Sequence, residues 1–409
     1  MCFTTLKAKS KMLEIHAVQQ WTLGDIEAHF FRTIEDCARL LPHSIDDVFL
    51  CADYWQALET APPQGMQFCY IVLTKQGKTI GFLPFQILHF NAGKSVNFDP
   101  NDHSFAQKVK QKIADKVDFN TLVLGNLSLT GQHLYWFDNQ EFIAIDKYNI
   151  ILSCIFNCKR ILNEYNVIIK NVLFKELYEP QKALDTEGYI RFSVEPNFVM
   201  PIDAAWKNFD DYLMAISSKY RVRAKRAFKK LGAVEKKEFN EERILAHKDI
   251  INTLYKTVSE KSGFNMVDLH PDYFYQMKCL LGERFRLFGY FLDNQLIGFY
   301  STVDNGNELD AHFIGYDEKL NIGHQTYLNF LFDFIKIAIE MDAKTINFSR
   351  TAHEIKSSVG ALPHEMYLYI KHDNPIVNRL LPFVPDYLSP RIAWTPRNPF
   401  AKNTEGGDN

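Results

Sequence analysis

The order of elements in the C-terminal third constrains the fold of this chain more than any other feature of its sequence. Residues 286–303 read as two β-rich runs joined by an Asp-Asn turn, which predicts a hairpin. A polar strand is predicted over 308–316, an amphipathic helix over 324–341 and a short buried strand over 345–348. This succession predicts an α/β structure in which a helix crosses over between strands of one mixed sheet.

The motifs at the end of this region are more specific. The order of strand, hairpin, polar strand, crossover helix and strand resembles the core of GNAT acyltransferases. NFSRT, EIK, VGALP and YLYI then resemble the closing segment of FemAB-like transferases, where FGRS, FK, WGxxP and YxY occupy the corresponding places. The chain departs from that pattern at Ser349, where the family has Gly, and in a shorter spacer before Lys356.

The N-terminal half repeats the order of elements. The predicted elements are a hairpin (68–74 and 79–88), a strand (121–124), a helix (149–165) and a strand (167–174). Within the hairpins, Ile80-Gly81-Phe82 corresponds to Ile297-Gly298-Phe299. We therefore expect an α/β fold with mixed sheets (α+β), made of two tandem GNAT-like domains, which is also the architecture that the FemAB resemblance implies.

Chain length and proline placement suggest the domain limits. A chain of 409 residues is too long for one ordinary core, so two domains are expected. The segment 188–202 is predicted to end the first sheet, which gives an N-terminal domain over 1–200 and a C-terminal domain, expected to be catalytic, over 201–375. Six prolines follow Asp373, and they predict a non-helical extension over 376–409.

Composition narrows the classes of function. The net charge of −3 does not favour binding of a polyanion by the whole molecule, so a nucleic-acid role would need a local patch. The seven cysteines form no CxxC pair, and Cys154 and Cys158 share an apolar helix face, so we expect buried reduced thiols, no metal site and a cytoplasmic location. The longest apolar run, 148–158, is about half the length that a bilayer-spanning helix needs.

The resemblance implies direct transfer from a thioester to an amine, with acyl-CoA or acyl carrier protein as donor co-substrate and no metal. The family binds donor phosphates at a loop before the crossover helix, here 317–325, with Gly323, His324 and Gln325 as candidate donor-binding residues. Asp317 and Glu318 would repel phosphate, so an ordinary strand-to-helix connection is an equal alternative.

Asp310 and His312 are the candidate acid–base pair. Strand alternation puts them on one face with Glu308, Ile314 and Tyr316, with Leu309, Ala311 and Phe313 opposite. Imidazole titrates near neutral pH, and a neighbouring carboxylate would orient it. We therefore predict His312 as the base, oriented by Asp310, with Tyr316 able to protonate a leaving thiolate and Glu308 in reserve. The alternative is a histidine that satisfies a hydrogen bond in a half-buried sheet.

Two cations and a basic run complete the candidates. Arg350 and Lys356 match the basic positions of the FemAB-like ending and are predicted to hold a phosphate or carboxylate; surface charge is the alternative. Residues 219–230 contain seven basic residues, which suit tRNA, acidic lipid, a nucleotide-bearing donor or simply a solvated helix. The loop 125–138 stands where a GNAT domain places its donor loop, and it would alternatively cover the acceptor of the other domain.

Three functions remain open. The first is N-acyl transfer from acyl-CoA or acyl carrier protein to an amine, with a small molecule or a lipid or cell-wall precursor as acceptor and contact with the inner face of the membrane as an added expectation. The second is aminoacyl-tRNA-dependent transfer to a cell-wall precursor, the one case in which nucleic acid is a partner. The third is a catalytically silent binding protein with the same fold.

Overall fold

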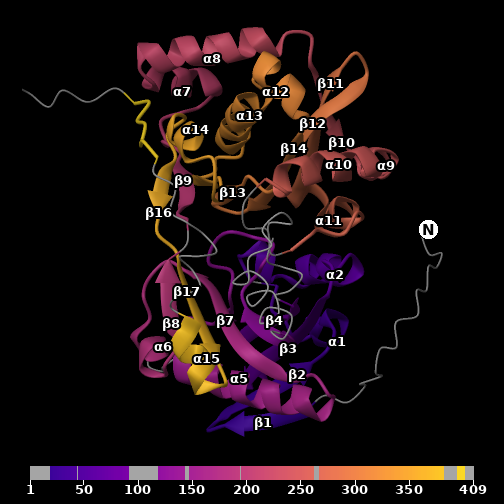
Figure 1. Ribbon diagram of the computed structural model, residues 1–409, viewed down its shortest axis with the longest axis vertical. Helices are drawn as coiled ribbons and strands as arrows, with labels where there is room; N and C mark the ends of the chain where they lie inside the picture. The colour runs from indigo at the N-terminus through magenta and orange to yellow at the C-terminus, as the bar shows by residue number, and fades with distance from the viewer. Residues whose placement is uncertain are drawn as a thin grey trace, which may run out of the picture.

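The computed structural model describes residues 19–43, 45–91, 118–142, 147–193, 195–261, 267–381 and 394–400. Two mixed sheets, one above the other along the longest axis, organise the chain (Figure 1). Most of the extension predicted over 376–409 lies outside the described residues.

The first sheet has the order β1-β2-β3-β4-β5-β7-β17-β8, and β6 pairs with β4. Its strands are β1 (Gln19–Leu23), β2 (Ile26–Phe31), β3 (Met66–Lys75), β4 (Lys78–Asn91), β5 (Asp118–Leu124), β6 (Trp136–Phe137), β7 (Ile169–Leu177), β8 (Ile190–Ser193) and β17 (Tyr367–His372). The helices of this half are α1 (Ile34–Ala38), the 3₁₀ turn η1 (Val48–Leu50), α2 (Ala52–Thr60), α5 (Lys147–Glu164), α6 (Lys182–Thr186) and α15 (Pro375–Leu380).

The second sheet has the order β10-β11-β12-β13-β15-β9-β16, and β14 pairs with β12. Its strands are β9 (Asn197–Pro201), β10 (Glu235–Phe239), β11 (Phe285–Leu292), β12 (Gln295–Asn305), β13 (Glu308–Asp310), β14 (Ile314–Tyr316), β15 (Thr345–Asn347) and β16 (Leu362–His364). The helices are α7 (Phe209–Ala215), α8 (Ser218–Leu231), α9 (Glu241–Ala246), α10 (Lys248–Ser259), α11 (Tyr273–Leu281), η2 (Gly282–Arg284), α12 (Glu318–His324), α13 (Thr326–Glu340) and α14 (His353–Ser357).

The predicted repeat is present in the pairing of the strands. β3 and β4 form the hairpin of the first half, and β11 and β12 form that of the second. Gly81 of β4 pairs with Phe137 of β6, and Gly298 of β12 pairs with Tyr316 of β14. In each half the next strand of the sheet runs parallel to the strand that follows the long helix, β5 with β7 and β13 with β15. The prediction of two tandem α/β domains is therefore confirmed.

The two halves exchange their last strands, which differs from the limits expected from the sequence. β9 was expected to end the first sheet, yet it lies between β15 and β16 of the second. β17 was expected in the C-terminal domain, yet it lies between β7 and β8 of the first sheet. Sequence periodicity identifies both segments as strands but contains no signal for the partner strand, because either sheet offers the same kind of edge.

Three large hydrophobic clusters and one small one (Val123, Leu173 and Leu368) fill the space around the sheets. One is shared by the halves and includes Trp55 and Phe82 from the first and Phe274 and Phe299 from the second. A second cluster packs α5 against the first sheet, with the buried thiols of Cys154 and Cys158 in it. The third packs α13 against the second sheet. Because the first cluster draws on both halves, the junction between them is a continuous core.

Two helices predicted from the sequence are each divided into two in the structure. The helix expected over 206–231 is interrupted at Ile216, whose extended backbone forms a bridge with Phe400. Asn208 caps the first piece through a reciprocal capping box with Asp211. The helix expected over 241–258 divides at His247 into α9 and α10.

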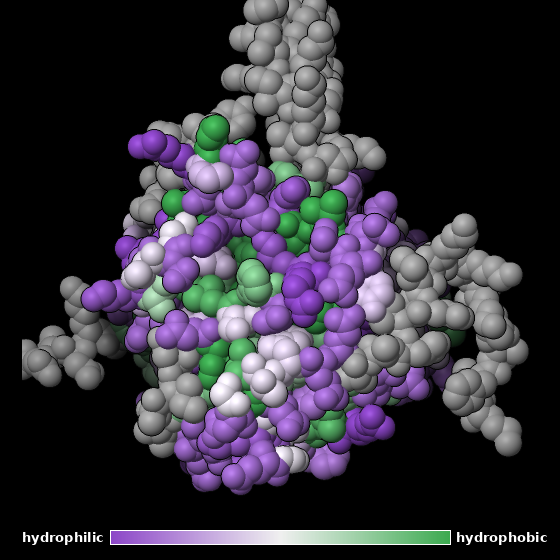
Figure 2. Space-filling view, turned by 90° about the horizontal axis from the view of Figure 1, so that it is seen from below, coloured by the Kyte–Doolittle hydropathy of each residue, from purple (hydrophilic) through white to green (hydrophobic). Residues whose placement is uncertain are grey.

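None of the helices among the described residues is long and apolar enough to cross a bilayer. The end of the molecule formed by the first sheet shows hydrophobic residues in separate areas among hydrophilic ones (Figure 2).

The strand exchange predicts a long-range effect of one residue. Tyr369 of β17 is fully buried, and its hydroxyl accepts a hydrogen bond from the Gln181 backbone at 2.6 Å. Tyr369→Ala should lower the free energy of unfolding by about 4 kcal/mol, whereas Tyr369→Phe should cost only about 1 kcal/mol. Hydrogen exchange should rise first in β7 and β8. Loss of protection confined to β15 and β16 would contradict the exchange.

Candidate functional site

A one-residue bulge interrupts the polar strand of the second half. Tyr300 and Val303 of β12 pair with Ile314 and Asp310, so three steps along β12 face four steps along the other strand. Ser301 bonds to two residues of the opposite strand: its N–H donates to the carbonyl of Phe313 at 2.8 Å, and its carbonyl accepts from the N–H of His312 at 3.0 Å. A bulge reverses the facing of every residue beyond it.

Because of the bulge, the side chains beyond it face the other way from the regular alternation predicted from the sequence. Asp310 and His312 face the core shared by the halves, whereas Ile314 and Tyr316 pack with Leu309 on the opposite side, against α13. The Tyr316 ring contacts Tyr327 and Phe330 there. Tyr316 therefore does not share a face with the Asp310–His312 pair, and regular alternation, which the sequence predicts, was wrong beyond residue 312.

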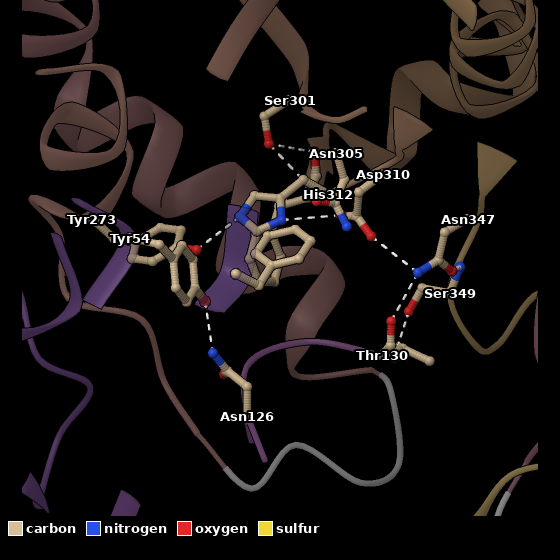
Figure 3. Close-up of polar contacts among 12 residues, drawn as sticks. Tyr54, Asn126, Thr130, Tyr273, Ser301, Asn305, Asp310, His312, Asn347 and Ser349 are labelled. Carbon is tan, nitrogen blue, oxygen red and sulfur yellow. Dashed lines mark hydrogen bonds and ion pairs between the residues drawn. The ribbon is translucent and has the colours of Figure 1, made fainter. Parts of the chain in front are cut away.

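In the first half, the strand equivalent to 308–316 is interrupted at the corresponding place by a loop between β5 and β6. Phe82 and Phe85 of β4 pair with Trp136 and Leu124, so residues 125–135 are inserted where the second half has its bulge. This loop extends to the second half, where the Thr130 carbonyl accepts from Asn347 at 2.8 Å and the Thr130 hydroxyl accepts from Ser349 at 2.8 Å (Figure 3).

A hydrogen-bonded chain crosses the junction. Asp310 contacts His312 Nδ1 at 3.1 Å with one carboxylate oxygen and accepts from Asn347 at 3.1 Å with the other (Figure 3). We call the residues of this chain and of its neighbours across the junction the junction network: Asp47, Thr130, His133, Asn305, Asp310, His312, Asn347 and Ser349. The pairing of His312 with Asp310 that the sequence predicts is present.

A second set of contacts in the junction network joins the halves through Asp47. Asn305 accepts from the Val48 backbone at 2.7 Å and donates to the Asp47 carboxylate at 3.2 Å. The other Asp47 oxygen lies 2.7 Å from His133 Nδ1. Although burial lowers the pKa of His133, the carboxylates of Asp47, Asp310 and Glu308 together raise it above its ordinary value. The surrounding carboxylates therefore favour the protonated form of His133.

Gly131 is required by the close packing of this loop. Its φ is +133°, and a Cβ there would lie 2.7 Å from His133 Nε2. Its N–H donates to the buried Glu176 carboxylate at 2.7 Å. Any side chain at this position would displace the imidazole from Asp47.

His312 is enclosed in a way that the sequence does not predict. Its side chain has no exposed surface, and its Nε2 lies 2.7 Å from the Tyr273 hydroxyl. The rings of Phe49 and Tyr273 stack on it at centroid distances of 5.9 and 5.8 Å. With both nitrogens occupied, this imidazole has no path to an amine from solvent, so its arrangement is that of a positioning residue.

Glu308 is a partly exposed carboxyl group next to the junction network. It accepts a hydrogen bond from Thr345 on the parallel strand at 3.2 Å. Burial, with the neighbouring Asp310 carboxylate, raises the pKa of Glu308 to about 7, against the opposing effect of the His133 cation. A carboxyl group that titrates near neutral pH exchanges protons readily under physiological conditions.

The predicted donor loop has a different structure. Residues 318–324 form α12, capped by the Asp317 side chain, and Gly323 lies inside that helix. His324 Nδ1 contacts the Lys230 carbonyl at 3.2 Å, and Gln325 adopts a left-handed conformation between α12 and α13. The N–H of Tyr327 is capped by Asn321 at 3.0 Å. Residues 317–325 thus form a capped helix and the turn into α13, and donor binding there stays a prediction.

Arg350 and Lys356 are both engaged within the protein. Arg350 forms an ion pair with the buried Glu176, which also contacts Lys175 at 2.8 Å. The Lys356 ammonium donates to the carbonyls of Ser349 and Arg350, and burial lowers the pKa of Lys356 to about 7. Ser349, Thr351 and Ala352 all have positive φ, so Lys356 ties down a strained loop. In this arrangement both side chains contact groups of the protein itself, and the binding of an anion by them stays a prediction.

Sequence reasoning missed several residues of the site. Asp47, Glu176 and Asn305 belong to no motif and enter the site only through the packing of the two halves. Thr130 and His133 lie in the loop 125–138, whose composition did mark it as unusual, and Asn347 lies in the NFSRT motif.

A comparison with solved structures identifies the fold. The crystal structure of FemX aligns with 89% of this chain and 99% of its own, with a TM-score of 0.51 and 12% sequence identity. The fold is that of FemX. The FemAB-like arrangement of tandem GNAT-like domains predicted from the sequence is thereby confirmed.

Two other structures align with lower scores. The C-terminal domain of a putative lysylphosphatidylglycerol synthetase from Agrobacterium fabrum has a TM-score of 0.47 and 9% identity, over 86% of this chain and 94% of its own. A tandem GNAT protein from the clavulanic acid biosynthesis pathway has a TM-score of 0.48 and 9% identity, over 85% and 99%. No protein-family profile and no curated protein sequence matches this chain.

The raised pKa of Glu308 predicts a pH-dependent effect on stability. A folded pKa of about 7 exceeds the ordinary value of 4.5, so the folded state binds more protons between these pH values and loses stability as the pH rises through this interval. Glu308→Gln should therefore raise the free energy of unfolding at pH 8 by up to ~3 kcal/mol, seen as a higher melting temperature. At pH 4.5 the substitution should have little effect. Equal shifts at both pH values would contradict the raised pKa.

Arg350 allows a test of structural against ligand-binding roles. Arg350→Met should lower the free energy of unfolding by about 3 kcal/mol, because Glu176 would keep a buried charge with one partner fewer. Adding Glu176→Gln should recover part of that loss in denaturant unfolding. A stable Arg350→Met variant would show instead that the guanidinium is available to a ligand.

Proposed function

We propose that this protein is an acyltransferase that moves an acyl group from a thioester donor, acyl-CoA or acyl carrier protein, to an amine. One observation carries the proposal: a carboxyl group with a pKa of about 7 stands beside the bulge, at the junction of the two halves. The acyltransferase-type fold supports the reaction class, and the geometry supports the choice of Glu308 as base.

The proposed reaction needs one proton acceptor. An alkylammonium has a pKa near 10 and must lose a proton before it attacks. The amine nitrogen then bonds to the thioester carbonyl carbon and the C–S bond breaks. The second proton that the nitrogen loses on becoming the amide passes, through solvent, to the departing thiolate, which leaves as thiol. Glu308 accepts the first proton of the ammonium group, because its carboxylate is partly exposed and has a pKa of about 7.

The junction network, together with the pairing of β13, holds Glu308 in place. β13 is fixed by pairing with β12 and β15, and Asp310 fixes its far end through His312 and Asn347. The Tyr273 hydroxyl completes the enclosure of His312. Asp310 and His312 act on the reaction through this strand, and we assign them as positioning residues.

The donor arm is proposed to lie along the edge that the bulge opens. β13 pairs with β15, but β14 pairs only with β12 among the described strands. The sheet therefore divides between β14 and β15, which leaves one edge of β14 without a strand partner. In the family that this chain resembles, backbone amides of such an edge hold the pantetheine arm. Thr326, at the start of α13, has a buried hydroxyl with no hydrogen-bond partner among the described residues.

The test is a rate measurement with saturating acetyl-CoA and a panel of primary amines, with the acylated product detected by mass spectrometry. Glu308→Gln should lower kcat by about a hundredfold with little change in the KM for the donor. The wild-type rate should rise with pH through an apparent pKa near 7, and the variant should lack that step. Glu164→Gln, a surface change on α5 with the same charge difference, is the control.

Two outcomes would redirect the proposal. A Glu308→Gln variant with the wild-type rate would remove Glu308 from the reaction. Product formation with aminoacyl-tRNA and with no CoA thioester would favour the second function considered from the sequence, which the FemX fold also accommodates.

A further inference from the structure

The basic run predicted from the sequence forms a helix at one end of the molecule. α8 contains all seven basic residues of 219–230 and lies across the end opposite the first sheet, roughly perpendicular to the longest axis (Figure 1). It packs on α12 and α13, so one long side of the helix faces outward. Because the helix lies along this end, its whole length can contact a flat surface at once.

The outward side of α8 combines cations with an apolar residue. Ala224 and Ala227 are buried against the body of the protein. At 100° per residue the opposite side of the helix holds Val222, Lys225 and Lys229, with Arg226 beside them. All four of these side chains are exposed. The outward side of α8 is therefore mainly cationic, with the aliphatic side chain of Val222 among the cations.

The cations of α8 are not balanced inside the protein. No ion pair joins any of the seven to an acidic side chain within the described part of the chain. Arg221 donates to the carbonyls of Leu213 and Met214. Like charges stand four apart at Lys225 and Lys229, a spacing that destabilises an isolated helix. A chain with a net charge of −3 therefore concentrates uncompensated positive charge on one helix.

Exposed apolar side chains lie on the neighbouring helices at the same end. Ile322 of α12 is 81% exposed, Met214 of α7 is 66% exposed and Val222 of α8 is 57% exposed. Phosphate groups of either RNA or lipid would attract the lysines and arginines. Only a bilayer also offers an apolar phase for aliphatic side chains, whereas nucleic acid would be met by aromatic or amide groups. The combination favours a lipid surface.

We propose that α8, with Met214 and Ile322 beside it, docks the protein on the surface of a membrane that contains anionic lipid. The cations pair with lipid phosphates, and the three aliphatic side chains enter the interfacial layer. The opposite end of the molecule has no comparable cationic helix among its described residues, and its exposed apolar residues form separate areas (Figure 2). The molecule therefore meets the membrane with α8 first and the first sheet away from it. This inference does not depend on the proposed reaction.

The test is sedimentation of the full chain with vesicles of phosphatidylcholine, with and without phosphatidylglycerol. Binding should require phosphatidylglycerol and weaken as salt is added. Each surface lysine contributes about fivefold to such binding, so Lys225→Gln with Lys229→Gln should weaken it roughly thirtyfold. The control, Lys170→Gln with Lys182→Gln, removes two exposed lysines from the first half and should leave the binding unchanged.

The apolar side chains separate a membrane from other anionic partners. Val222→Ser with Ile322→Ser keeps every charge and should still weaken vesicle binding severalfold. Binding that responds equally to both lysine pairs would overturn the proposal. So would binding of a tRNA mixture, with no binding to the anionic vesicles and no response to the serine substitutions, because α8 would then be a nucleic-acid surface.

Discussion

The exchange of the last strands is the interaction on which the rest of the structure depends. β9 leaves the first half to separate β15 from β16, and β17 returns from the second half to separate β7 from β8. Each sheet is therefore complete only when both halves are present. β17 pairs with strands that precede it by more than one hundred residues, so the pairing has a high loop-closure cost and must come late in folding. The junction network is held at a fixed geometry because this exchange fixes the two sheets relative to each other.

Much of the fold could be predicted from the sequence because it depends on local periodicity. The hairpins, the long helices and the tandem order follow from alternation and helical spacing, and the glycines at 81 and 298 do occupy equivalent places. The partner of each exchanged strand could not be predicted, because pairing between distant strands leaves no local pattern. The bulge opposite Ser301 could not be predicted for a related reason. One additional residue in a polar strand changes which side chains share a face, but it does not change the composition of the strand.

The candidate site shows the same division between local and tertiary information. Asp310 and His312 could be paired from their spacing alone, and the pair is present. The burial of His312 could not be foreseen, because one of the two rings that enclose it belongs to Phe49, more than 250 positions away in the sequence. Burial decides the chemistry here. It removes the imidazole from solvent, and it raises the pKa of Glu308, which regular alternation had placed on the same face.

The loop 125–135 and the bulge at residues 312–313 stand at the same point of two similar sheets. If both halves descend from one duplicated unit, the two copies have diverged at that point into unlike parts. The second copy keeps a short break that opens its sheet, and the first has extended the break into a segment that contacts its twin through Thr130. A duplicated protein with two equal sites would gain capacity. Here the two halves instead supply unlike parts: the second supplies the strand with Asp310 and His312, and the first supplies the loop that contacts the neighbouring strand at Asn347.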